Sequence, residues 1–352
     1  MQKLAWQKNT PVIGLAPMDG WTDSPFRQIC KEHGADLVFS EMIPAPGIIH
    51  WHVKRRGERP FASTGNKFEN ILYFSELERP FVMQIFGKKP DEMAEACWIF
   101  NGGIHVGAYC NTPIRPDEIN INFGCPAKSA VSSGHGVALM DNPDLAAEIV
   151  RRCVESSIIP ISVKMRTGWQ SADEAVPFAQ KMEQAGASTI YIHGRTFKQK
   201  YSGLADWDKI YEVAKSVKIP VVGNGDITSE NVKSQMSKVK SNGLAGVLIG
   251  RAARGNPWIF EKTLSNMTTW SNLTNWTNKT QTILKHANLM YQLKGEHGII
   301  EFRKHLLHYL TGFPQASKIR QQAVKVTSIE DVKQTLNNIR ILDPRSKSGM
   351  TE

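Results

Sequence analysis

Eight short apolar runs, separated by segments with helical character, dominate the first 250 residues or so. The runs are rich in β-branched residues and lie at 12–16, 37–40, 81–85, 119–123, 161–165, 189–193, 221–223 and 246–249. Helix-like segments occur between them at 25–33, 90–100, 143–156, 172–185, 208–216 and 229–241. Strands that alternate with helices form a parallel sheet. Eight such units predict a closed (β/α)8 TIM barrel, because the alternative, an open doubly wound sheet, usually has fewer strands.

The composition changes after the eighth run. Residues 263–280 are rich in Thr, Asn, Ser and Trp, and we interpret them as a linker. Helical periodicity resumes at 280–294, 298–311, 315–324 and 328–341, with breaks at Gly295, 312–314 and Thr327. We therefore expect a catalytic barrel over residues 1–262, a small all-α helical bundle over 281–342 and a flexible polar tail over 343–352.

Charge and cysteine usage narrow the class of protein. The net charge is +10, and the part from Trp258 onward holds 13 Lys and Arg against 7 Asp and Glu. A basic surplus favours an anionic partner, most simply nucleic acid or an anionic membrane. The chain has no apolar stretch of about 18 residues and no signal-peptide pattern, so we expect no membrane span and a cytoplasmic location. Its five cysteines are scattered without a CxxC pair, which predicts neither a disulfide framework nor a metal site.

Polar residues follow nearly every predicted strand. Barrel enzymes carry their chemistry at the carboxyl ends of the strands, which meet at one mouth. The residues expected at this mouth are Pro17, Met18, Glu41, Gln84, Asn122, Cys125, Lys164, Arg166, His193, Arg195, Asn224, Gly225, Asp226, Gly250 and Arg251.

The ends of the seventh and eighth strands are rich in glycine. Residues 222–226 and 249–251 allow backbone N–H groups to approach a phosphate, and Arg251 adds a positive charge. Two plain tight turns are the alternative. Lys164 ends an apolar strand and should point into the mouth, where a lysine stabilises the negative charge of a reduced flavin. Gln84 and His193 could hydrogen-bond such a ring or the substrate, although His193 alone could be an ordinary buried histidine.

Cys125 lies just after the fourth strand and between Gly124 and Pro126. A free thiol has a pKa of about 8.5 and is mostly protonated at neutral pH, so it can donate a proton without any adjustment of its pKa. No base that could activate it as a nucleophile is adjacent in sequence. Taken alone, Cys125 could still be a nucleophile, a ligand or a core residue.

The chain resembles the tRNA-dihydrouridine synthases over nearly its whole length. The segments that carry the resemblance are 15–23, 82–87, 120–128, 133–140, 163–169, 192–196, 223–227 and 249–253. The resemblance implies that NADPH reduces a bound FMN, that hydride passes from flavin N5 to uracil C6, and that the cysteine protonates C5.

The resemblance also implies a role for each motif residue. Pro17, Met18 and Asp19 would line the flavin, and Gln84 and Lys164 would bind its ring. Asn224, Gly225, Asp226, Gly250 and Arg251 would hold the ribityl chain and phosphate. Asn122, Arg166 and His193 would flank the stacked uracil, His193 would also contact the cofactor, Arg195 would bind the substrate, and Cys125 would be the acid. Three features depart from the family pattern, namely Asp19, His135 and the long stretch 101–116 with Cys110.

A uridine in folded tRNA must leave its stack to reach a flavin, which requires a broad basic surface to hold the backbone. The candidate phosphate contacts in the helical domain are Arg303, Lys304, His305, Lys318, Arg320 and Lys325. Each could equally belong to an ordinary solvated helix face. The sequence indicates no obligate protein partner.

Two rival functions are considered. An FMN barrel that reduces a free pyrimidine, like dihydroorotate dehydrogenase, would share the phosphate site and the lysine but would not need a basic helical domain. A tRNA-binding chaperone without catalytic activity would not need Cys125, Lys164 and Gln84.

Overall fold

The computed structural model describes residues 11–55, 67–103, 115–261, 273–312 and 316–342. The chain divides into two compact units. The barrel unit comprises Met1–Ser24 and Ala35–Gly250, and the helical unit comprises Pro25–Gly34 and Arg251–Glu352. The predicted tail and most of the stretch 101–116 lie outside the described residues.

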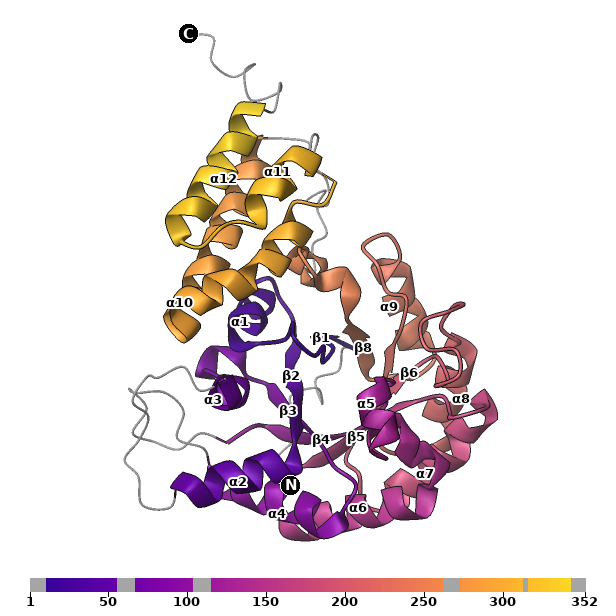
Figure 1. The fold of residues 1–352 in the computed structure, drawn as a ribbon. Helices are drawn as coiled ribbons and strands as arrows, with labels where there is room; N and C mark the ends of the chain where they lie inside the picture. Colours follow the sequence, from indigo (N-terminus) through magenta and orange to yellow (C-terminus); the bar gives the residue numbers. More distant parts are fainter. Residues whose placement is uncertain (1–10, 56–66, 104–114, 262–272, 313–315, 343–352) are drawn as a thin grey trace. The chain divides into compact units, whose positions relative to one another are not determined.

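Eight strands close into a parallel barrel in the order β1 to β8, with β8 paired to β1 (Figure 1). The strands are β1 (Val12–Leu15), β2 (Leu37–Pro44), β3 (Phe81–Phe86), β4 (Glu118–Phe123), β5 (Ile161–Arg166), β6 (Ile190–His193), β7 (Val221–Asn224) and β8 (Gly246–Ile249). This architecture confirms the predicted (β/α)8 fold. Strand β2 runs four residues beyond its predicted end at Ser40, and its pairing with β3 shifts register between Phe39 and Met42.

Helices connect the strands of the barrel unit. They are α2 (Ala45–Arg55), α3 (Lys67–Leu72), α4 (Pro90–Asn101), α5 (Lys128–Ser132), α6 (Pro143–Ser156), α7 (Ala175–Gln184), α8 (Trp207–Ser216) and α9 (Val232–Ser241). Proline at the first position of α4 and α6 suits the start of a helix, where its missing N–H is not needed. The sequence did not predict α2, α3 or α5, which are additions to the βα repeat.

The inside of the barrel has an apolar cluster and a polar column. Buried apolar residues from several strands pack together, and Phe39 meets the edge of Tyr191 at a ring-centroid distance of 4.8 Å. Along β4, by contrast, Glu118, Asn120 and Asn122 alternate with isoleucines and are all buried. Polar groups inside a barrel need hydrogen-bond partners, and here these partners determine the geometry at the carboxyl ends of the strands.

The helical unit combines most of α1 (Ser24–Glu32) with the C-terminal helices. These are α10 (Leu273–Tyr309), α11 (Ala316–Ala323) and α12 (Ile329–Leu342), preceded by two short 3-10 turns, η4 (Arg251–Ala253) and η5 (Pro257–Phe260). Phe26 of α1 is fully buried, 5.7 Å from the ring of His286 and 5.2 Å from that of His305. The domains predicted from the sequence were continuous segments, so the predicted helical domain did not include α1, which lies near the start of the chain.

Helix α10 is interrupted at Gly295, whose φ of 61° and ψ of −148° are not helical, so the predicted break there is confirmed. The helix begins at Leu273, inside the segment predicted to be a linker. Thr and Asn are weak helix formers, but tertiary packing overrides such propensities. Here the buried Lys279 places its ammonium 5.4 Å from the centre of the Trp258 ring. In the described parts of the chain, no helix combines the length and the apolar character needed to cross a membrane.

Candidate active site

The strand register brings the predicted polar residues together at the carboxyl ends of the strands. Asn122 on β4 pairs with Lys164 on β5, and Arg166 on β5 pairs with His193 on β6. His193 in turn pairs with Asn224 on β7. Residues in register on neighbouring parallel strands lie side by side, so Asn122 and Lys164 form one level, and Arg166, His193 and Asn224 form the next level toward the carboxyl ends of the strands.

The loop that carries Cys125 is fixed on both sides. The Asn122 Oδ1 atom accepts hydrogen bonds from the backbone N–H groups of Gly124 at 3.0 Å and Cys125 at 2.9 Å. The Cys125 carbonyl accepts from the backbone N–H of Val137 at 3.3 Å. Gly136 has a φ of +60°, and a Cβ atom there would lie 3.0 Å from the Cys125 carbonyl oxygen. The turn at 133–136 therefore supports the cysteine, and only glycine fits its last position.

The environment of Cys125 favours the protonated thiol. Partial burial is the largest effect and raises the thiol pKa above its ordinary value, and the charge of Asp19 raises it further. A hydrogen bond from the Ala127 backbone and the charges of Arg166 and Lys164 act in the opposite direction. Because the net shift is upward, Cys125 is a neutral thiol at neutral pH and is suited to donate a proton.

Lys164 is a half-buried cation at the same mouth. Burial is the main cause that lowers its pKa to about 8, and the charge of Arg166 contributes. Within the part of the chain that the structure describes, its recorded hydrogen bond is to Asn224 Oδ1 at 3.4 Å. Asn224 is held in turn through its Nδ2, which donates to the Leu248 carbonyl at 2.8 Å. A half-buried ammonium with a neutral amide as its partner can bind an electron-rich or anionic group as a ligand.

Gln84 is 1% exposed and is bonded to its neighbours at both ends of its amide. Its Nε2 donates to Asn120 Oδ1 at 2.8 Å, and its Oε1 accepts from Asn122 Nδ2 at 2.9 Å. Asn120 donates to Ser162 Oγ at 2.8 Å. Sequence reasoning missed Asn120 and Ser162 because they lie inside the strands rather than at their ends. The polar alternation at 118, 120 and 122 was the available signal.

Two arginines predicted to bind substrate anchor the loop at 194–206 that follows β6. Arg166 donates from Nε to the Gly124 carbonyl at 2.9 Å and from Nη1 to the carbonyls of Thr196 at 3.0 Å and Lys200 at 2.9 Å. Arg195 donates from Nη2 to the Gly203 carbonyl and to both Asp226 carboxylate oxygens, each at 2.7 Å.

Both guanidinium groups are almost wholly buried, at 3% residue exposure. A direct contact with substrate therefore stays a prediction for Arg166 and Arg195. The structure shows that both side chains form hydrogen bonds with the loops at the mouth.

The predicted phosphate corner brings together the ends of β1, β7 and β8. Gly225 and Asp226 both have positive φ, at 132° and 51°. The Asp226 carboxylate also accepts from the Ala205 N–H at 2.7 Å. A Cβ on Gly250 would meet only Ala16 Cβ at 3.7 Å and Met18 Sδ at 3.8 Å, which are ordinary contacts. Pro17 and Met18 are half-buried beside this corner, and Arg251 begins the helical unit with an exposed side chain.

A family model described as Dihydrouridine synthase (Dus) matches residues 14–343. The chain belongs to the dihydrouridine synthase family. It is 34% identical over 312 residues to the "Probable tRNA-dihydrouridine synthase" of Rickettsia conorii, which covers 88% of this chain and 87% of that protein. It is also 34% identical over 320 residues to the tRNA-dihydrouridine synthase B of Pasteurella multocida, covering 90% and 88%. A solved structure of the old yellow enzyme homologue from Zymomonas mobilis has a TM-score of 0.44 at 12% identity, over 70% of this chain and 86% of that one.

Two of the residues that were expected to depart from the family pattern, Asp19 and His135, lie in the part of the chain that the structure describes. Asp19 is exposed, and its charge affects the Cys125 thiol as noted above. His135 is half-buried with its ring edge-on to Phe86 at 5.6 Å. Burial, followed by the charge of Lys88, lowers the pKa of His135.

The helical unit of this dihydrouridine synthase exposes only some of the predicted phosphate contacts. Lys318, Arg320 and Lys325 are exposed. Arg303 and Lys304 are half-buried, and Arg303 Nε donates to the Val326 carbonyl at 2.8 Å.

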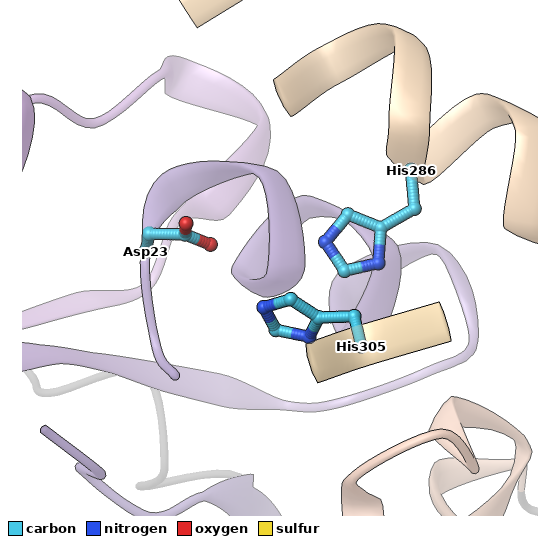
Figure 2. Close-up of side chains that lie close together, drawn as sticks. All are labelled: Asp23, His286 and His305. Carbon is cyan, nitrogen blue, oxygen red and sulfur yellow. The ribbon is translucent and has the colours of Figure 1, made fainter. Parts of the chain in front are cut away.

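The prediction for His305 was wrong, because this residue is fully buried among aromatic rings. Its own ring centre lies 4.5 Å from that of His286, which lies on the other side of the Gly295 break in α10, and Figure 2 shows the two imidazoles side by side. In the sequence, His305 follows two basic residues, and the sequence pattern did not indicate that His305 faces the interior of the helical unit.

Proposed function

We propose that this chain is a tRNA-dihydrouridine synthase that reduces the C5–C6 double bond of uridine in tRNA, with FMN as its cofactor and NADPH as reductant. Its family and its relatives' names support the reaction class. The observation that carries the proposal is the presence of a fixed, neutral thiol and a half-buried ammonium on neighbouring strands. Cys125 follows β4, and Lys164 lies two residues before the end of β5, at the same end of the barrel.

The residues at the mouth fit a flavin. When bound, the flavin supplies the hydride that is added to uracil C6. The half-buried Lys164 ammonium would offer a positive charge to the ring, where it would stabilise the negative charge of a reduced flavin. The glycine-rich ends of β7 and β8 suit the ribityl phosphate.

Cys125 donates the proton to uracil C5. Its raised pKa keeps the proton on the sulfur until a proton acceptor on the substrate lies next to it. Its fixed backbone holds the sulfur in one position. The thiolate left behind is stabilised by the charges of Lys164 and Arg166, both of which favour the ionised sulfur. A proton from water restores the thiol for the next turnover.

A tRNA substrate explains the basic C-terminal part of the chain. The target uridine must be turned out of its stack, so the energy of backbone contacts has to offset unstacking. The exposed cations Lys318, Arg320 and Lys325 of the helical unit are suited to phosphate contacts.

The test is reconstitution. Purified protein should carry FMN, and with NADPH it should form dihydrouridine in tRNA lacking that modification. Free uridine at the same concentration is the matched control and should not be reduced. A colourless protein, or reduction of free uridine as efficiently as tRNA, would contradict the proposal.

A further inference from the structure

A continuous hydrogen-bonded chain runs through the barrel interior from the Cys125 loop toward the amino ends of the strands. It starts at the backbone N–H groups of Gly124 and Cys125, which donate to Asn122 Oδ1. Asn122 Nδ2 then donates to Gln84 Oε1, and Gln84 Nε2 donates to Asn120 Oδ1. Three side-chain amides on two adjacent strands are thereby joined in series.

The chain continues below Asn120. Asn120 Nδ2 donates to Ser162 Oγ at 2.8 Å, and the Ser162 hydroxyl donates to the Ile119 carbonyl at 3.5 Å. Next along β4, the Glu118 carboxyl accepts a hydrogen bond at Oε1 from the Tyr191 hydroxyl at 3.0 Å. Every one of these side chains is buried.

The hydrogen-bond donors and acceptors along this chain of side chains can be arranged in only one way. Backbone N–H groups can only donate, so Asn122 must present its oxygen to them and its nitrogen to Gln84. The same logic fixes the amides of Gln84 and then Asn120. Rotating any one amide by half a turn would place donor against donor, which leaves buried groups unsatisfied at about 1–3 kcal/mol each. Cooperative chains of this kind hold their members in a single arrangement.

We propose that Asn120 is a positioning residue for the Cys125 loop, acting through Gln84 and Asn122. The side-chain hydrogen bonds of Asn120 are to Gln84 and Ser162, not to Cys125. Asn120 fixes the amide of Gln84, which fixes the Asn122 oxygen on which the Gly124 and Cys125 backbone rests. The inference rests on the proposed function in one respect, which is that Cys125 is the proton donor.

The test compares Asn120→Ala with Asn120→Asp in the flavin-loaded, full-length protein. The alanine variant removes the acceptor of Gln84, whereas the aspartate variant keeps an oxygen there. Thr189→Val is the matched control, because Thr189 is equally buried in the barrel and lies outside the chain of bonds. Ser162→Ala, which removes only the far partner of Asn120, is the milder variant if Asn120→Ala fails to fold.

For Asn120→Ala we expect flavin content and the KM for tRNA to stay at their wild-type values. We expect kcat to fall by on the order of tenfold or more, because small displacements of a reacting group are costly. Asn120→Asp should recover most of this loss, and Ser162→Ala should lower kcat less than Asn120→Ala. An unchanged kcat in Asn120→Ala would overturn the proposal. A parallel loss of flavin content, tRNA affinity and kcat that Asn120→Asp does not rescue would also overturn the proposal.

A second readout does not depend on turnover. The rate at which iodoacetamide alkylates Cys125, followed by mass spectrometry of its peptide, should rise several-fold in Asn120→Ala and remain unchanged in Thr189→Val. If the wild-type protein makes no dihydrouridine, the proposed function fails while this rate still tests the positioning role. Identical alkylation of Cys125 in Asn120→Ala and wild type would refute that role.

Discussion

Replacing Glu118 with glutamine should remove a pH-dependent loss of stability. Glu118 is wholly buried at the start of β4, and burial is the main cause that raises its pKa from 4.5 to about 7. Hydrogen bonds from Ser162 and Tyr191 lower the pKa but do not outweigh burial. A buried carboxyl with a pKa of about 7 is neutral in acid and must ionise inside the protein as the pH rises.

The sign and size of the effect follow from the two states. In the unfolded chain this carboxyl ionises near 4.5, whereas in the native protein it ionises near 7. Between these values the native state holds more protons, so the free energy of unfolding falls as pH rises. One pH unit of difference corresponds to about 1.4 kcal/mol, which gives a loss of roughly 3 kcal/mol between about pH 4.5 and pH 7.

Glutamine cannot ionise, yet its carbonyl oxygen still accepts from the Tyr191 hydroxyl. We therefore expect Glu118→Gln to gain about 3 kcal/mol relative to wild type when the pH is raised from about 4.5 to about 8. The assay is urea unfolding at a series of pH values. Glu155→Gln, which removes an exposed carboxyl of α6, is the control and should follow the wild type. Wild type and Glu118→Gln curves that run parallel across this range would refute the reasoning.

Three further outcomes are expected. Lys164→Met should weaken FMN binding about tenfold or more, because it removes the positive charge that this half-buried side chain would offer to the ring; titration of the apoprotein with FMN checks this. Gly136→Ala should lower turnover about tenfold or more, whereas Gly134→Ala, which has a similar positive φ but whose Cβ would make only ordinary contacts with the Lys88 side chain, should lower it much less. Replacing Lys318 and Arg320 together with alanine should reduce the slope of log affinity for tRNA against log salt by about 2, measured by filter binding; an unchanged slope would exclude both as phosphate contacts.

The barrel could be predicted from the sequence because its signal is local and repeated. Each strand is a short β-branched run, and all eight are present within a few residues of their predicted bounds. The predicted helices between strands were also found, since a proline start, as at Pro90 and Pro143, marks the boundary. The helices α2, α3 and α5 do not belong to that repeat, and nothing in its periodicity announces them.

The positions of the candidate site residues at the strand ends could be predicted, but their hydrogen bonds to one another could not. Strand-end residues such as Asn122 and Lys164 were expected at the mouth, where the register places them. Which of them bonds to which depends on side-chain direction in three dimensions. Arg195 illustrates this, because its ion pair with Asp226 joins positions that are 31 residues apart.

Burial of single polar residues was the least predictable property. His305 follows Arg303 and Lys304 and reads as part of a basic surface, yet α10 turns it toward the aromatic rings of Phe26 and Phe302. Glu118 similarly starts β4 and could have been solvent-exposed. Whether a charged group faces water is decided by packing between elements that are distant in the sequence.

The central claim is that Cys125 donates the proton to C5 of a uridine in tRNA. The most direct measurement compares the wild type with Cys125→Ala, both loaded with FMN and reduced by NADPH, in single turnovers with tRNA. We expect the alanine variant to bind flavin and tRNA normally but to form dihydrouridine slower by at least about 100-fold, the range that general acid catalysis contributes. Dihydrouridine formation by Cys125→Ala at the wild-type rate would contradict the claim.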